Sequence, residues 1–131
     1  MARRVRSSSW LPMVVSILVA CSPSQASPSG TPVAGSAAAA GRGICATIAA
    51  MPDLSAAERT FTNDAHAALH ALAAAPGLDH ALAGRVLVAM DRVHADFTSA
   101  TATTLAADLH ALATATGQAL LNLREPAPPC D

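Results

Sequence analysis

The sequence predicts an all-α fold: a small up-down bundle of three long helices plus a short leading helix, closed by one disulfide. Apolar residues recur every three or four positions through three segments between residues 54 and 123, which is the period of an amphipathic helix. Cys45 and Cys130 lie on either side of these segments. A chain of 131 residues, about half of them apolar, has room for one modest domain.

The first two predicted elements are bounded by prolines. Residues 44 to 51 form an apolar run that ends before Pro52, so we expect a short leading helix there. The first long helix begins with a capping box, Ser55 with Glu58 three residues later, and ends at Pro76. Its apolar residues fall on one side at about 100° per residue, and they are Leu54, Phe61, Ala65, Ala68, Leu69 and Leu72.

The second and third long helices are expected over residues 78 to 97 and 101 to 123. Neither glycine nor proline separates them, so one continuous helix is the alternative. The phase of the apolar residues favours two helices, because an unbroken helix would place Leu109 about 140° away from Val86. We therefore expect a turn near Thr98 and Ser99, whose short polar side chains compete for backbone hydrogen bonds.

Cys45 and Cys130 are predicted to form a disulfide. In an up-down bundle the chain ends meet only when the number of helices is even. This pairing therefore requires the leading segment to act as a fourth helix, or at least to run back along the bundle. Closing a loop of about 86 residues would contribute about 4 to 5 kcal/mol in the chain-entropy model. The alternative is a pair of metal-binding or reactive thiols.

The first 20 residues have the organisation of a signal peptide. Arg3, Arg4 and Arg6 precede an apolar run over residues 10 to 20, and small residues follow at a possible cleavage point. The run is shorter than the roughly 20 apolar residues that a transmembrane helix needs. We therefore expect residues 1–20 to be removed during export.

The end of the apolar run, Leu18-Val19-Ala20-Cys21, resembles the lipobox of bacterial lipoproteins. This resemblance implies cleavage before Cys21, a thioether-linked lipid on Cys21, and fatty acylation of the freed amine. The protein would then be anchored in a membrane of the cell envelope, on its extracytoplasmic face. The alternative is ordinary cleavage after residues 24 to 26, Ser-Gln-Ala, with Cys21 discarded.

Residues 21–43 are predicted to be the lipidated cysteine and a disordered tether, which leaves 44–131 as the helical domain. The tether is composed mainly of Ser, Pro, Gly and Ala, and its mean span would be about 25 Å. A chain that starts at Cys21 retains five arginines against nine acidic residues. This acidic balance argues against binding to nucleic acid.

Histidines are the candidate metal ligands. His66 and His70 lie one helical turn apart, a spacing at which two imidazoles can bind one ion. A third ligand would have to come from His80, Asp64 or Asp79. We predict instead that His66 and His70 are surface residues and that the chain holds no metal or other cofactor, while two further histidines, His94 and His110, are half-buried structural residues.

No combination of residues predicts an enzyme. Asp91 lies one turn from His94 and can orient its imidazole, but a nucleophile that would complete a catalytic group is not evident. The sequence therefore predicts a lipid-anchored envelope protein whose helical domain binds or supports another envelope protein. The alternative function is binding of a small ligand, either a transition metal through surface histidines or an apolar molecule between helices.

Overall fold

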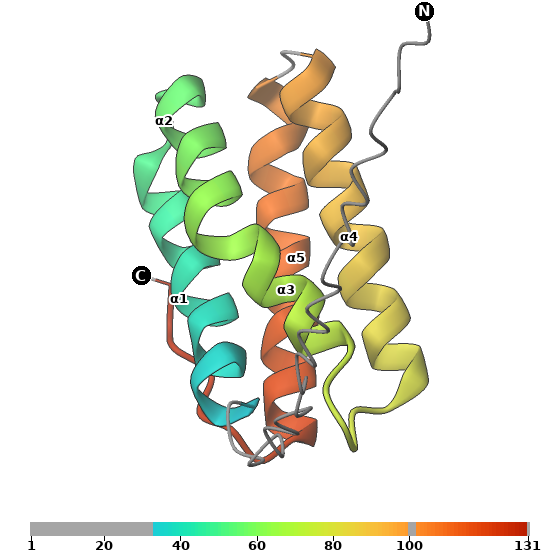
Figure 1. Cartoon of the computed structure of the whole chain (residues 1–131). Coiled ribbons are helices and arrows are strands. Elements are labelled where there is room, and N and C mark those ends of the chain that lie inside the picture. Colours follow the sequence, from blue (N-terminus) through green and yellow to red (C-terminus); the bar gives the residue numbers. More distant parts are fainter. Residues whose placement is uncertain (1–32, 100–101, 131) are drawn as a thin grey trace, which may run out of the picture.

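The computed structural model describes residues 33–99 and 102–130, and these form a four-helix bundle (Figure 1). The elements are α1 (Val33–Ala50), α2 (Leu54–Thr60), the π-helical segment η1 (Phe61–Ala65), α3 (His66–Ala73), α4 (His80–Ser99) and α5 (Ala102–Asn122). No strand occurs in the described residues. The predicted all-α bundle with an even number of helices is therefore confirmed.

The four helices of the bundle are α1, the continuous segment from α2 to α3, α4 and α5, and each runs opposite to the one before it (Figure 1). Helix α1 packs between α3 and α5. Segments α2, η1 and α3 follow one another without a break and together act as the second helix of the bundle. The interior is mostly aliphatic, with one phenylalanine and two buried threonines, Thr47 and Thr116. Its largest fully buried apolar side chains are Phe61, Ile44, Leu69, Leu72, Leu105, Leu109, Leu112, Leu120, Val86 and Val93. No helix in the described ranges has the length and apolar character needed to cross a membrane.

The leading helix is much longer than the sequence predicts. Helix α1 begins at Val33, so the tether boundary placed at residue 43 is wrong; residues 1–32, with Cys21, lie outside the described residues. The composition of residues 33 to 43 suits a flexible linker, but alanine also has the highest helix propensity. Packing decides between the two, because Ala37 and Ala40 are fully buried in the core.

Two glycines allow α1 to approach its neighbours closely. A Cβ atom on Gly41 would lie 2.7 Å from ring carbons of Pro128, in the segment that follows α5. A Cβ atom on Gly43 would lie 2.5 Å from the carbonyl oxygen of Asp64 and 2.7 Å from Cα of Ala65. The Gly41 and Gly43 positions thus let one face of α1 contact the C-terminal segment and another contact the backbone of η1.

Helix α2 begins at a different cap from the one predicted. The carboxylate of Asp53 accepts a hydrogen bond from the backbone N–H of Ala56 at 3.0 Å, whereas the predicted cap, Ser55, lies inside the helix. Asp53 is an equally good capping residue, and it directly follows Pro52. The π-helical turn of η1 is also absent from the sequence prediction, because a single widened turn leaves little trace in an apolar repeat.

The division between α4 and α5 agrees with the predicted turn near Thr98 and Ser99. The hydroxyl of Thr98 donates to the carbonyl oxygen of Ala95 at 2.8 Å, and that of Ser99 donates to the carbonyl oxygen of Asp96 at 3.1 Å. Such side-chain bonds compete with the helical ladder and favour its end. The expectation of two helices instead of one is therefore confirmed.

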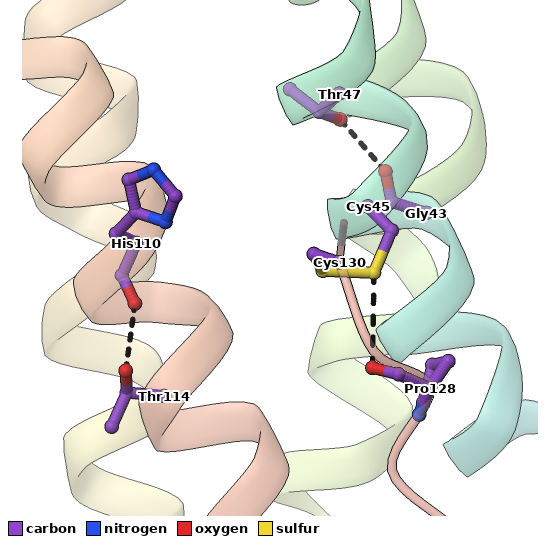
Figure 2. Close-up of a disulfide and its surroundings, with 7 residues drawn as sticks. All are labelled: Gly43, Cys45, Thr47, His110, Thr114, Pro128 and Cys130. Carbon is purple, nitrogen blue, oxygen red and sulfur yellow. Dashed lines mark hydrogen bonds between the residues drawn. A yellow bond between two sulfur atoms is a disulfide. The ribbon is translucent and has the colours of Figure 1, made fainter.

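The predicted disulfide joins Cys45 and Cys130, with Cα atoms 4.8 Å apart (Figure 2). Cys45 lies well inside α1, so the even helix count alone does not bring the cysteines together. The segment after α5 runs back along α1 to reach Cys45 (Figure 1). Sγ of Cys45 lies 3.9 Å from the carbonyl oxygen of Pro128. Two residues further along α1, the hydroxyl of Thr47 donates to the carbonyl oxygen of Gly43 at 2.8 Å.

Candidate functional site

Two phenylalanine and three histidine side chains lie close together where η1 and α3 meet α4. We call the three histidines, His66, His70 and His94, the histidine cluster. The ring centroid of His66 lies 4.8 Å from that of His70 and 4.9 Å from that of His94, both in edge-to-face geometry. Phe61 lies beneath them, 5.1 Å from His94 and 5.7 Å from Phe97.

The local helix geometry explains how these rings meet. Phe61 is the first residue of η1 and is fully buried, and His66 opens α3 one widened turn later. His94 follows the buried Val93 on α4, and Phe97 lies almost one turn further along the same helix. The two phenylalanines are the only ones in the chain. The seam between η1 and α4 therefore contains both large apolar rings of the folded part, with imidazoles along its outer edge.

The positions of the histidines differ in part from those predicted. His70 is exposed as expected, but His66 is half-buried, because on a helix it lies only about 60° from the buried Leu69. His94 is half-buried as expected, whereas His110 is exposed on α5. The contact between His66 and His94 joins residues of different helices, and neither local spacing nor periodicity predicts it.

The environment of His66 favours its neutral form. Burial lowers the pKa of its imidazole below the ordinary value of 6.5, and the neighbouring His94 and His70 lower it further because a second positive charge close by is unfavourable. A neutral imidazole can pack edge to face against an aromatic ring and still accept a proton. The cluster thus combines an apolar seam with one imidazole, that of His66, whose pKa is held below its ordinary value.

The pH dependence of stability should reveal this perturbed histidine. Below about pH 6.5 the unfolded chain takes up a proton on residue 66 that the folded chain resists, so this group lowers stability as the pH falls. We expect the wild-type Tm to fall more steeply from pH 7.5 to 5.5 than the Tm of His66→Gln. Thermal melts followed by circular dichroism measure both slopes.

His110→Gln is the matched control for that comparison, because His110 is exposed and lies outside the cluster. Its Tm should follow the wild-type slope. Equal slopes for wild type and His66→Gln would contradict the perturbed environment assigned to His66.

The geometry of the described residues does not form a metal centre. No group of three His, Cys, Asp or Glu residues within ranges 33–99 and 102–130 is arranged to hold a metal ion. Asp79, one of the suggested third ligands, caps α4 by accepting hydrogen bonds from the backbone N–H groups of Ala81 and Leu82 at 2.9 and 3.1 Å. The two described cysteines are joined to each other.

A second cluster of titratable groups lies near the turn between α4 and α5. Asp96 Oδ1 accepts a hydrogen bond from the hydroxyl of Thr104 at 2.8 Å, while Asp96 Oδ2 is buried and has no hydrogen-bond partner among the described residues. Loss of solvent raises the pKa of the neighbouring Asp108 carboxyl, hydrogen bonding and repulsion from Asp96 raise it further, and Arg92 partly offsets the rise. Two carboxyl groups form a hydrogen bond only when one of them carries a proton.

Asp108→Asn should therefore stabilise the protein. An asparagine amide can donate a hydrogen bond to the Asp96 carboxylate without a proton being taken up, and it removes the repulsion between two carboxylates. We expect a Tm a few degrees above that of the wild type at pH 7. The gain should shrink as the solution is made acidic, because the raised pKa of Asp108 lets its carboxyl take up a proton.

The control for Asp108→Asn is Asp91→Asn, which makes the same charge change at an exposed position on α4. A Tm of Asp108→Asn at or below the wild-type value would show that the two carboxyl groups do not interact as described.

No protein-family model, no curated protein and no solved structure shows significant similarity to this chain. The lipidation residue predicted from the sequence, Cys21, lies outside the described residues. Within the described fold, the rings of the histidine cluster and the carboxyl groups of Asp96 and Asp108 are titratable groups that meet from different helices.

Proposed function

We propose that this protein is a lipoprotein of the bacterial cell envelope, anchored by lipid on Cys21, whose helical bundle binds or supports another envelope protein. The disulfide between Cys45 and Cys130 carries this proposal, because disulfides form and persist in exported proteins and are rare in the cytosol. The lipid anchor on Cys21 is proposed because the sequence Leu18-Val19-Ala20-Cys21 resembles a lipobox.

The start of α1 at Val33 supports a bundle held close to the membrane. Only residues 22–32 separate Cys21 from the first helix, and a chain of that length spans at most about 40 Å when fully extended. The N-terminal end of α1 lies at the same end of the bundle as the C-terminal end of α5 (Figure 1). That end would face the bilayer, and the sides of the bundle would face neighbouring membrane proteins.

Surface shape favours a protein partner over a small ligand. The small cavity beside the disulfide, lined by Ile44, Thr116 and Cys130 among others, measures only about 20 Å³, which is about enough for one water molecule. Larger depressions of about 300 to 430 Å³ are open furrows on the outside of the bundle. Open furrows between helices suit another helix or loop better than an enclosed ligand.

The anchor is tested by Cys21→Ala. We expect the variant to accumulate as an uncleaved or mislocalised precursor and to lose all labelling by a clickable fatty acid, since the lipid is attached through Cys21 itself. The full-length chain is expressed in its own cells, labelled and analysed by gel fluorescence.

Cys45→Ser is the matched control, because it removes a different cysteine and should retain the label. Labelling of Cys21→Ala at the wild-type level would exclude the anchor. The interaction function is tested separately, by crosslinking in membranes with the anchor intact.

A further inference from the structure

A shallow groove runs between α4 and α5 on the outside of the bundle. It has a volume of about 430 Å³, and we call it the α4–α5 groove. The residues that the argument uses are Gly84, Arg85, Val88, Arg92, Ala111 and Ala115, all of which line it. Small side chains on both helices make the furrow, since glycine and alanine leave the space between two packed helices unfilled.

The centre of this groove is apolar and exposed. Val88 is 54% exposed, one of two large apolar side chains that are strongly exposed in the described part of the chain. It lies on α4 opposite Ala111 and Ala115 of α5, which offer no bulky side chain to cover it. Furrows of this kind accept the ridge of a third helix, as they do inside helical bundles.

Arginines give the groove a charge opposite to that of the chain as a whole. Arg85 and Arg92 are exposed and stand seven residues apart on α4, about 10 Å along the helix axis, with Val88 between them. The entire sequence carries a net charge of −1. A partner that covers Val88 would therefore gain most by placing carboxylates at the same two-turn spacing.

We propose that the α4–α5 groove binds an amphipathic helix of another envelope protein, with acidic residues two turns apart that pair with Arg85 and Arg92, and small or apolar residues between them that cover Val88. This inference rests on the proposed function and names the surface and the chemistry of the partner. Helices α4 and α5 lie side by side along the bundle (Figure 1). A neighbouring membrane-anchored protein can therefore reach the groove between them.

A second copy of this chain is a poorer match to the groove. Within the described helices no two acidic residues are seven positions apart, and the two acids of α4, Asp91 and Asp96, are five apart and so lie on different faces. Copies of the chain therefore lack the acidic spacing that the groove requires. Self-association and binding of anionic lipid become outcomes of the test.

Photo-crosslinking in the native envelope tests the proposal. The full-length chain, with its anchor intact, carries the photoreactive residue p-benzoylphenylalanine at the exposed position 88, and a control chain carries it at Thr62, which is exposed on η1. After irradiation, mass spectrometry identifies the molecule and the peptide joined to residue 88. We expect a peptide of a different protein, from a helix with Asp or Glu at a seven-residue spacing.

Arginine variants show whether the contact depends on charge. Arg85→Gln with Arg92→Gln should lower the yield of the crosslink at residue 88 by about tenfold, in line with two lost ion pairs at a protein surface. Arg59→Gln removes the same kind of charge from exposed α2 and should leave the yield unchanged. Thermal melts confirm that each variant is folded, which matters because Arg92 also lies near Asp108.

A crosslink from residue 88 to lipid, to a second copy or to a protein segment without paired acidic residues would overturn the groove proposal. So would a crosslink yield that stays unchanged when both arginines are replaced. Absence of any crosslink at residue 88 with a protein crosslink at residue 62 would overturn the groove and leave the interaction function standing. Absence of protein crosslinks at residues 88 and 62 would contradict the groove proposal and the proposed interaction function alike.

Discussion

Removal of the Cys45–Cys130 disulfide is expected to lower the free energy of unfolding by about 4 kcal/mol. The two cysteines are separated by 85 residues, so the bond restricts almost the whole helical part of the unfolded chain. Many of the buried side chains are alanines, which bury little apolar area each. A loss of this size is a large share of the roughly 5 to 15 kcal/mol that stabilises an ordinary domain.

Denaturant unfolding of the exported domain, with and without reductant, measures this loss. The double variant Cys45→Ser, Cys130→Ser should match the reduced wild type, and added reductant should leave its stability unchanged. A difference of less than about 1 kcal/mol between oxidised and reduced protein would show that the closing segment contributes little. It would also show that the four helices are stable without it.

The sequence is sufficient to predict the last three helices of the bundle, which are the segment from α2 to α3, α4 and α5, because their apolar repeats are strong. Leu105, Leu109, Leu112 and Leu120 recur at helical spacing on α5, and all four are buried as the repeat requires. The predicted disulfide adds an expectation that periodicity alone lacks, an even number of helices, and the bundle has an even number. Cys130 nevertheless reaches Cys45 only because the segment after α5 runs back along α1 (Figure 1). These two kinds of information together predict the architecture that is observed.

The start of α1 could not be predicted in the same way. Residues 33 to 43 contain Gly, Ala, Ser, one Arg and a single larger apolar residue, Val33, so they have no apolar repeat of large side chains. Their burial depends on close backbone packing, in which the absence of side chains is the favourable property. A linker and a tightly packed helix can therefore share one composition, and only the tertiary contacts distinguish them.

The candidate site shows a similar limit. Half-burial of His94 follows from its place beside the apolar stripe of α4, and the same reasoning applied to His66, one turn from Leu69, would have predicted its burial as well. Their contact across the bundle depends on how α3 and α4 pack and on the widened turn of η1, which no local signal in the sequence reveals. The pairing of Asp96 with Asp108 likewise depends on the packing of α4 against α5.

Gly43→Ala is expected to destabilise the protein by about 2 to 3 kcal/mol, although alanine is the better helix former. The new Cβ atom would lie 2.5 Å from the carbonyl oxygen of Asp64 and 2.7 Å from Cα of Ala65, and both are backbone atoms. They cannot rotate away as a flexible side chain could. Relief of the clash would require α1 and η1 to separate, which would loosen the packing of the buried Phe61.

Gly84→Ala is the matched control for this prediction, because it makes the same change inside a helix where a Cβ atom meets nothing within 4 Å. It should stabilise the protein by about 0.5 to 1 kcal/mol through helix propensity alone. Unfolding in denaturant measures both variants, and hydrogen exchange at residues 61 to 65 should quicken in Gly43→Ala only. If Gly43→Ala were as stable as Gly84→Ala, the close backbone approach between α1 and η1 would be wrong, and with it the explanation for glycine at this position of α1.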